Sequence, residues 1–364
     1  MMFRAKPPRW TVSVLTIPQR EPYLAKLLDS LGSQKFRHPW ELQVVYNWDT
    51  SEEPYAVQRR LKKLAKGLPL EVHFNTQQPT IVGGRMQQLA LCKSPLICFL
   101  DDDLTLHGDV FAVIEEAMRE LPLGIVGLPS LVGDTKKLFK PRKGTPYVDA
   151  HGVRFMQVQG MLIAGYRRLF RDIGGFNPRR TFWGEWTEMN LRMWRNGFPS
   201  AYVMDGAYLR HWEDAPESPT RNKAGREDHV LWGLLCTALE YDAGECRPDT
   251  ESFWKLVENR YLAYSFGIDA TPRQLLASVL RLVPRLATEW PHINAFREMT
   301  RQHPFQFAPF HALEPSEVED VLRYAEEHIA PYRVPVFGSE ARRSGRWLKR
   351  AVETVTTRAR RAAG

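Results

Sequence analysis

The stretch PLICFLDDD (Pro95–Asp103) contains the features that decide the fold of this chain. PLICFL is a continuous apolar run, which is typical of a strand buried in the centre of a parallel sheet. Asp101, Asp102 and Asp103 follow it directly. Three adjacent carboxylates at a strand end repel one another and destabilise the fold unless a positive group lies beside them. The stretch therefore predicts a buried strand that ends in a site for a positive ligand.

The chain before this strand alternates between strand-like and helix-like patterns. The predicted strands are Trp10–Ile17, Glu41–Tyr46 and Leu70–Asn75, and the predicted helices between them are 21–34, 55–68 and 85–92. This β-α-β-α order predicts a doubly wound, mostly parallel α/β sheet. Ligands of such a sheet bind just beyond the carboxyl ends of the strands, where the three aspartates lie.

After the aspartates the α/β pattern continues and then becomes helical. We expect a helix at 109–120, a strand at 124–128, a polar and basic loop at 132–149 and an apolar stretch at 160–165. Beyond about Trp212 the pattern is helical, and Ser316 and Glu319 have the spacing of a capping box. We therefore expect an α/β domain at 1–235, a helical accessory region at 236–340 and a basic amphipathic tail at 341–364.

Composition argues against a membrane-spanning protein and against a disulfide scaffold, and the charge is concentrated in one segment. No run approaches the roughly 20 apolar residues that a membrane-spanning helix needs, and the four cysteines show no CxxC spacing. The segment 342–361 holds eight basic residues and one acid, a net +7 of the +8 of the whole chain. We expect a cytoplasmic protein. Since the rest of the chain is nearly neutral, any broad electrostatic contact with an anionic membrane surface or nucleic acid belongs to this tail. A frayed, solvated tail is the alternative.

A hard divalent cation is one answer to the charge of the three aspartates. Mg²⁺ and Mn²⁺ take carboxylate oxygens and keep positions open for phosphate. The alternative is a solvated acidic turn that caps the next helix. The residues around the turn favour the metal.

In these residues the chain resembles the GT-A glycosyltransferases, in particular the large inverting family two, from about Trp10 to Trp212. VSVLTIPQREPYLAKLLDSL resembles the opening of that family, and FLDDD resembles its metal-binding turn. The resemblance implies that Asp101 and Asp103 bind Mn²⁺ or Mg²⁺, that Asp101 and Asp102 bind the donor, and that Arg85 contacts the nucleotide or its diphosphate.

The segment GGFNPRRTFWGEWTEMNLRMWRNGF (Gly174–Phe198) resembles the Gly-Glu-Asp segment of family two and the Trp-Gly-Gly-Glu-Asn segment of the polypeptide N-acetylgalactosaminyltransferases. Glu185 would begin a helix whose next turn carries Glu188 and Arg192 as an i, i+4 pair. A carboxylate at a helix N-terminus that faces a cleft suits the hydroxyls of a donor or acceptor. We predict Glu185 and Glu188 as catalytic residues; the alternative is that Glu185 only caps the helix.

A histidine and several tryptophans complete the predicted site. AYLRHW (Ala207–Trp212) reads as a strand that ends in His211, and in the resembled families a histidine at that point is the remaining metal ligand. Indole rings stack well on sugars and bases. The rings predicted to stack on acceptor or sugar are Trp183, Trp186 and Trp212, whereas Trp194 is expected in the core.

Two departures from the family pattern affect the expected roles. YNWDT follows the second strand where the family has aspartates, so Asn47 or Asp49 would contact the nucleoside. Trp186 stands where the family has its presumed base. Either Glu185 supplies the base or the enzyme departs from the usual inverting mechanism, and the stereochemical outcome stays open.

Together these patterns predict a metal-dependent glycosyltransferase that uses a nucleotide-sugar, with UDP as the expected nucleotide, and transfers the sugar to a hydroxyl group. The acceptor classes left open are a glycan, a lipid-linked intermediate, a protein side chain and a hydroxymethylated base of phage-type DNA. DNA modification would use the basic residues of 136–143 and the tail, and would require an extruded base. A domain that binds nucleotide-sugar or glycan without turnover is the alternative. A nucleotidyltransferase fits less well, because TIPQREPY is not a glycine-rich phosphate loop.

Overall fold

The computed structural model describes residues 8–47, 52–141, 145–158, 160–180, 184–212, 223–241, 272–308 and 311–338. The strands are β1 (Trp10–Thr16), β2 (Trp40–Asn47), β3 (Leu70–Asn75), β4 (Leu96–Asp101), β5 (Leu104–Gly108), β6 (Ile125–Gly127), β7 (Ser130–Val132), β8 (Leu138–Lys140), β9 (Val148–Ala150), β10 (Val153–Phe155), β11 (Leu162–Tyr166), β12 (Ser200–Tyr202) and β13 (Ala207–His211). The helices are η1 (Pro18–Arg20), α1 (Glu21–Gly32), α2 (Pro54–Leu64), α3 (Ile81–Leu91), α4 (Val110–Glu120), α5 (Arg167–Asp172), α6 (Glu185–Arg195), α7 (Lys223–Tyr241), α10 (Pro272–Thr300), α11 (Pro315–His328) and α12 (Ala330–Phe337).

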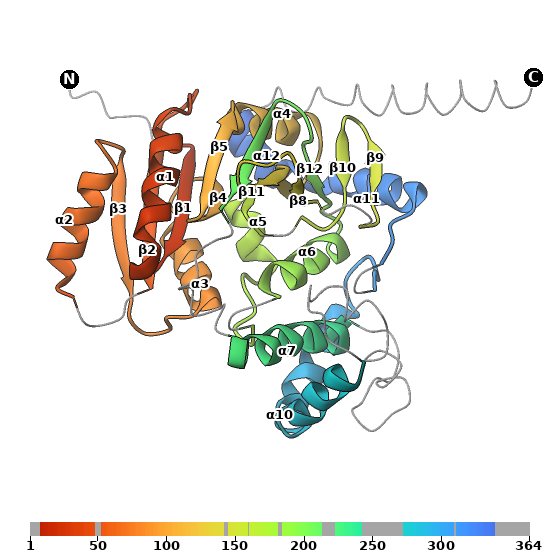
Figure 1. Ribbon diagram of the computed structural model, residues 1–364. Helices are drawn as coiled ribbons and strands as arrows, with labels where there is room; N and C mark the ends of the chain where they lie inside the picture. The colour runs from red at the N-terminus through yellow and green to blue at the C-terminus, as the bar shows by residue number, and fades with distance from the viewer. Residues whose placement is uncertain are drawn as a thin grey trace, which may run out of the picture.

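Nine strands form the central sheet, in the order β3-β2-β1-β4-β11-β6-β12-β10-β9 (Figure 1). The pairs within β3-β2-β1-β4 are parallel, as the β-α-β-α pattern predicts. From β4 to β11 the pairing becomes antiparallel, with Leu100 opposite Leu162. The expected α/β fold is confirmed. The sheet is less parallel than expected, because its pairs beyond β4 are antiparallel except for β6 with β12.

A second, four-stranded sheet in the order β5-β13-β7-β8 lies directly after the acidic turn. β5 and β13 are antiparallel, and their register places His211 opposite Leu104, the residue that follows Asp103. Although β5 and β13 lie about a hundred residues apart in the chain, this pairing brings the histidine to the aspartates. The segment 132–149, which we expected to be loop, contains β8 and the start of β9.

The predicted helical region after Trp212 is present and packs on the α/β core. α7 and α10 lie side by side below the sheet region (Figure 1). Buried apolar residues of α11 and α12 belong to the same core cluster as the strands; they are Val318, Val321, Leu322, Ala325 and Val336. α7 crosses the predicted boundary at 235/236 without interruption, so the division of the chain stays a prediction.

The start of α11 differs from the predicted capping box. The helix begins at Pro315, and the carboxylate of Glu317 accepts the backbone N–H of Glu314 at 2.8 Å. Glu319 instead pairs with His151 at 2.8 Å. The predicted Ser316–Glu319 box was therefore wrong, because the helix starts at Pro315, two residues earlier than a Ser316 cap requires, and Glu314 and Glu317 form the capping box. Among the described helices, none combines the length and apolar character needed to cross a bilayer.

Candidate active site

The acidic turn at the end of β4 is compensated by protein cations. Asp101 lies in register with Leu15 of β1 and forms an ion pair with Arg85. Its backbone N–H donates to the carbonyl of Met161 at 2.9 Å, and its Oδ2 accepts the N–H of Met161 at 3.2 Å. The side chain of Asp101 is 29% exposed, whereas those of Asp102 and Asp103 are about 5% exposed or less. Of the three, Asp101 therefore offers the accessible carboxylate.

Asp102 is held between β1 and the turn that follows it. Thr16 Oγ1 donates to Asp102 Oδ2 at 2.6 Å, and Arg20 Nε donates to Oδ1 at 2.6 Å. Burial raises the pKa of Asp102 to about 7; the charge of Arg20 opposes this rise and the charge of Asp103 adds to it. Both carboxylate oxygens of Asp102 therefore already accept hydrogen bonds from the protein. The predicted contact of Asp102 with the nucleotide-sugar donor stays a prediction.

Asp103 and His211 form the buried half of the site. His211 Nε2 lies 3.0 Å from Asp103 Oδ2, and the backbone N–H of Trp212 donates to the carbonyl of Asp103 at 2.9 Å. Phe139 of β8 packs on the imidazole with 4.5 Å between the ring centroids. Burial tends to raise the pKa of Asp103, but the hydrogen bond and charge of His211 and the charge of Arg20 hold it at about 2.

The donor atoms of this pair suit a divalent cation. Asp103 Oδ1 and His211 Nδ1 are buried and have no hydrogen-bond partner in the structure. A carboxylate oxygen with an imidazole nitrogen is an accepted ligand combination for Mn²⁺. Within the described ranges no three His, Cys, Asp or Glu side chains gather into a metal site. Because the two nitrogens of an imidazole ring point in nearly opposite directions, His211 Nδ1 faces away from Asp103 while Nε2 binds Oδ2. A cation shared by the two residues would therefore use Asp103 Oδ1 and His211 Nε2, released from Oδ2, and leave its other positions to phosphate and water.

Arg85 reaches the turn from α3, which packs closely on β1. A Cβ atom at Gly84 would lie 2.3 Å from Leu15 Cδ1, so a side chain at this position would push α3 away from the sheet. The Arg85 guanidinium pairs with Asp101 and lies over the ring of Trp186, with 5.6 Å between Cζ and the ring centroid. Arg85 is only 3% exposed, so its positive charge acts in a poorly solvated environment.

Glu185 begins α6, as predicted, and is half-buried. The preceding Gly184 has φ +83°, and a Cβ there would lie 3.3 Å from the backbone of Gly233 in α7. Burial raises the pKa of Glu185 to about 7; its own backbone N–H and the charge of Arg85 oppose the rise, and the charge of Asp101 adds to it. Glu185 therefore shares an electrostatic environment with Arg85 and Asp101.

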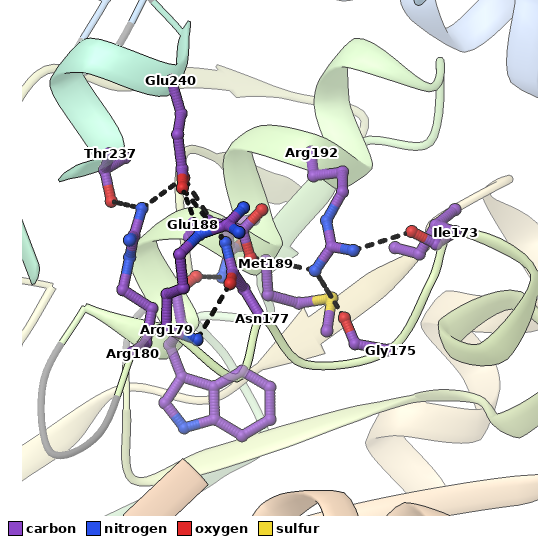
Figure 2. A network of polar contacts seen from close by, with 12 residues as sticks. Ile173, Gly175, Asn177, Arg179, Arg180, Glu188, Met189, Arg192, Thr237 and Glu240 are labelled. Atoms are coloured by element: carbon purple, nitrogen blue, oxygen red, sulfur yellow. Dashed lines mark hydrogen bonds and ion pairs between the residues drawn. The ribbon is translucent and has the colours of Figure 1, made fainter. Parts of the chain in front are cut away.

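Glu188 lies in a different environment from the one that we expected. Its carboxylate is fully buried, pairs with Arg192 at 2.9 Å and accepts a hydrogen bond from Tyr241 of α7. It belongs to a buried polar network between α6, α7 and the segment before 181, in which Arg180 pairs with Glu240 at 2.5 Å (Figure 2). The i, i+4 pair is confirmed, but a carboxylate enclosed in this way cannot reach a substrate. The structure therefore corrects the predicted catalytic role of Glu188.

The tryptophans divide between core and rim. Trp194 is 2% exposed and donates to Ser200 Oγ at 2.8 Å, which confirms it as a core residue. Trp186 is 6% exposed and packs edge-on against Phe99 and Phe176. Because almost no surface of Trp186 is left for a sugar, the structure corrects its predicted stacking role.

Trp212 is half-buried at the rim of the site. Lys26 of α1 lies over its ring, with 4.7 Å from Nζ to the centroid. Its stacking on a sugar or base stays a prediction. The prediction for Trp183 lies outside the described residues.

Of the two predicted nucleoside-contacting residues, Asn47 lies within the described part of the chain. Asn47 donates through Nδ2 to the carbonyl of Thr80 at 3.1 Å and accepts from Asn75 at 2.7 Å, so its amide holds the segment before α3. Its contact with a donor stays a prediction, and Asp49 lies outside the described residues. Arg20, which pairs with both Asp102 and Asp103, was missed, because no local pattern marks an arginine in a turn as the partner of carboxylates 82 residues later.

Comparison with known sequences gives the family of this region. The model of "Glycosyl transferase family 2" matches residues 14–180, a range that includes the end of β1, Arg85 and the acidic turn. This range is somewhat less than half of the chain. The chain is a glycosyltransferase, and the GT-A resemblance inferred from the sequence is confirmed. No protein in the curated set matches the chain.

Solved glycosyltransferases are similar to the chain in structure. GalNAc-T7 with UDP, GalNAc and Mn²⁺ matches with a TM-score of 0.53 at 13% identity, over 82% of this chain and 58% of that one. Residues 1–349 of S. aureus TarS match with a TM-score of 0.45 at 17% identity, over 80% of this chain and 90% of that one. The mannosyltransferase PcManGT from Pyrobaculum calidifontis, with GDP-Man and Mn²⁺, matches with a TM-score of 0.45 at 16% identity, over 92% and 85%. The glycosyltransferase spans somewhat more than half of GalNAc-T7, and this likeness establishes the fold.

Proposed function

We propose that this glycosyltransferase takes a sugar from a nucleotide-sugar and transfers it to a hydroxyl group of an acceptor. The observation that carries the proposal is that Arg85, Asp101 and Glu185 interact electrostatically at the acidic turn that also holds the Asp103–His211 pair. The site lies at the carboxyl ends of β1 and β4, where doubly wound sheets bind their ligands. We further propose that residues 1–235 form the catalytic part, 236–340 an accessory part and 341–364 a separate tail.

Asp103 and His211 would hold Mn²⁺ or Mg²⁺ through Asp103 Oδ1, which has no partner in the protein, and through His211 Nε2, which faces Asp103. A bound divalent cation neutralises a diphosphate and so makes it a better leaving group. Arg85 adds a fixed positive charge on the same side of the sheet, since it is buried and bound to Asp101. These residues together suit the departure of a nucleoside diphosphate.

Glu185 is the proposed base or acceptor anchor. Its raised pKa, about 7, is suited to accepting a proton from a hydroxyl near neutral pH. Glu188 and Trp186 are excluded from this role by their burial, which leaves Glu185 as the carboxylate of α6 that faces Asp101 and Arg85. The stereochemical outcome, inversion or retention at the anomeric carbon, depends on the face from which the acceptor hydroxyl attacks.

A donor screen tests the function and separates an enzyme from a binding protein. UDP- and GDP-sugars are added to the full-length protein with and without MnCl₂, and thermal stability and donor hydrolysis are both measured. We expect one nucleotide class to stabilise the protein in a Mn²⁺-dependent manner and to be hydrolysed slowly, and UDP-sugars are the first candidates. Stabilisation without hydrolysis or transfer would favour the non-catalytic alternative.

The Asp103→Ala variant tests the metal. We expect it to lose both Mn²⁺-dependent stabilisation by the donor and turnover, because it removes the carboxylate that carries the free Oδ1. Full activity of the wild-type protein in EDTA would remove the metal from the proposal.

The acceptor is proposed only by class: a glycan, a lipid-linked intermediate, a protein or a hydroxymethylated base in DNA. The basic tail at 342–361 favours an anionic acceptor surface, since it holds almost all of the net charge. A salt series of acceptor binding distinguishes these classes, as described in the Discussion.

A further inference from the structure

Arg20 occupies the position on the acidic turn where a divalent cation would be expected. Its Nε and one terminal nitrogen each lie 2.6 Å from Asp102 Oδ1, and the same terminal nitrogen lies 2.5 Å from Asp103 Oδ2. One guanidinium thus bridges the carboxylates of Asp102 and Asp103. Bridged ion pairs with charge-assisted hydrogen bonds are among the stronger polar contacts in proteins.

The backbone that carries Arg20 places it at the rim of the site. Arg20 ends the short helix η1 and directly precedes α1, with φ −107° and ψ 5°. Its side chain is 12% exposed, and its guanidinium carbon lies 5.9 Å from the ring centroid of Tyr23. A long side chain at such a rim reaches the carboxylates or the space above them by changing its rotamers alone.

A divalent cation and Arg20 compete for the same carboxylate. Asp103 Oδ2 already receives Arg20 and His211, and only Oδ1 is without a partner. A cation on Asp103 would lie close to the guanidinium, and the two positive charges would repel each other in this poorly solvated site. Arg20 must therefore move away from Asp103 when the cation binds. A nearby diphosphate is the group that a displaced guanidinium binds best, through paired N–H donors.

We propose that Arg20 is a diphosphate-binding residue of the donor site that is held on Asp102 and Asp103 while the donor is absent. The inference rests on the proposed function, since it assumes a nucleoside diphosphate beside the acidic turn. It adds a role for a residue that the family resemblance did not mark. In this role Arg20 keeps the metal site weak until cation and diphosphate arrive together.

The proposal predicts opposite effects of one substitution on two ligands. Arg20→Ala and Arg20→Gln are compared with wild-type full-length protein by calorimetric titration with MnCl₂ alone, and then with UDP or GDP in excess MnCl₂. We expect Mn²⁺ alone to bind about 10-fold tighter or more to the variants, because a competing cation is gone. We expect the nucleotide to bind about 10-fold weaker, since a charge-assisted contact with phosphate is lost.

Arg60→Ala is the matched control. Arg60 forms ion pairs with Glu21 and Glu52 near the start of α1, 2.7 Å from each, and touches no aspartate of the turn. We expect both affinities to be unchanged in this variant. Arg20→Lys keeps the positive charge but loses the paired N–H donors of the guanidinium. We therefore expect Mn²⁺ alone to bind as in wild type, and nucleotide affinity to lie between that of wild type and that of Arg20→Ala.

The outcomes separate this inference from the proposed function. Unchanged or weaker Mn²⁺ binding by both neutral variants would overturn the competition, as would nucleotide affinity that survives the loss of Arg20. If wild-type protein binds neither nucleotide with Mn²⁺, the proposed function fails, whereas the titration with MnCl₂ alone still reports on the competition. If the neutral variants do not fold, wild-type nucleotide affinity in Arg20→Lys would overturn the role of the guanidinium fork.

Discussion

The guanidinium of Arg85 lies over the ring of Trp186, and Trp186 directly follows Glu185 in α6. Through this contact the arginine that pairs with Asp101 also packs on the helix that carries the proposed base. The position where the resembled family has its base is thus occupied by an aromatic ring that orients Arg85. We conclude that Trp186 contributes to the site through Arg85 and not through the substrate.

Replacement of Glu185 by Gln tests the proposed base. We expect donor affinity to be kept and the rate of transfer to fall by about 10²-fold or more, which is the usual scale for loss of a general base. Donor binding by calorimetry and transfer by product analysis measure the two effects separately. An equal loss of donor binding would instead make Glu185 part of the donor pocket.

The pH dependence of transfer follows from the same residue. Because the pKa of Glu185 is raised to about 7, its carboxyl group is protonated below that pH and cannot accept a proton. We expect the rate to rise about tenfold per pH unit up to about pH 7 and then to level off. The profile of Glu185→Gln should lack this rise; a wild-type rate that falls through pH 7 would indicate an acid in place of a base.

Trp186 should be replaceable by another aromatic residue but not by a small one. Trp186→Ala leaves a cavity between Phe99 and Phe176, and we expect it to lower the free energy of unfolding by about 3–5 kcal/mol. Trp186→Phe should lose about half of that or less, since it keeps a ring under Arg85. Urea unfolding measures both. Similar stability of the Ala and Phe variants would contradict the packing role.

The Arg180–Glu240 pair should stabilise the contact of α7 with the segment before α6. Both side chains are fully buried, so Arg180→Met leaves a carboxylate without its main partner, and we expect a loss of about 3–5 kcal/mol. The double variant Arg180→Met/Glu240→Met should lose less than the sum of the single variants. The exposed pair of Arg301 and Glu298 is the control, and its removal should cost at most about 1 kcal/mol.

Removal of residues 341–364 tests the role of the basic tail, which lies outside the described residues. We expect donor hydrolysis to be unchanged, since every group of the proposed site lies before residue 212. If the acceptor is DNA or an anionic lipid, the truncation should weaken acceptor binding and flatten its dependence on salt. Identical salt curves for full-length and truncated protein on DNA, anionic vesicles and a neutral glycan would show that the tail has no part in acceptor choice.

The sequence was most informative where local pattern and topology agree. The apolar run before Asp101 predicted β4, and the β-branched run from Trp10 predicted β1, because the buried central strands of a parallel sheet are apolar along their length. The closeness of Asp103 and His211 could also be predicted, since both follow strands with a recognised place in the resembled family. The second sheet could not, because β7 and β8 are three residues each and pair only through tertiary contacts.

The wrong expectations concern which face of a helix is covered. Glu188 follows Glu185 by three residues, and spacing alone cannot show that α7 covers the side of α6 on which Glu188 lies. Arg20 was missed for a related reason, because its partners are brought to it by the pairing of β1 with β4. In both cases the missing information was the position of a distant segment, which no local sequence pattern carries.

The glycine contact at the start of α6 has a consequence for directed evolution of this enzyme. Gly184 has a positive φ, which strains any other residue, and a Cβ atom there would lie 3.3 Å from the backbone of Gly233 across the α6–α7 contact. A side chain at this position would therefore disturb the start of α6, where Glu185 lies. A variant library aimed at new acceptors should keep Gly184 fixed, and diversity is better placed at Trp212 and Lys26 at the rim.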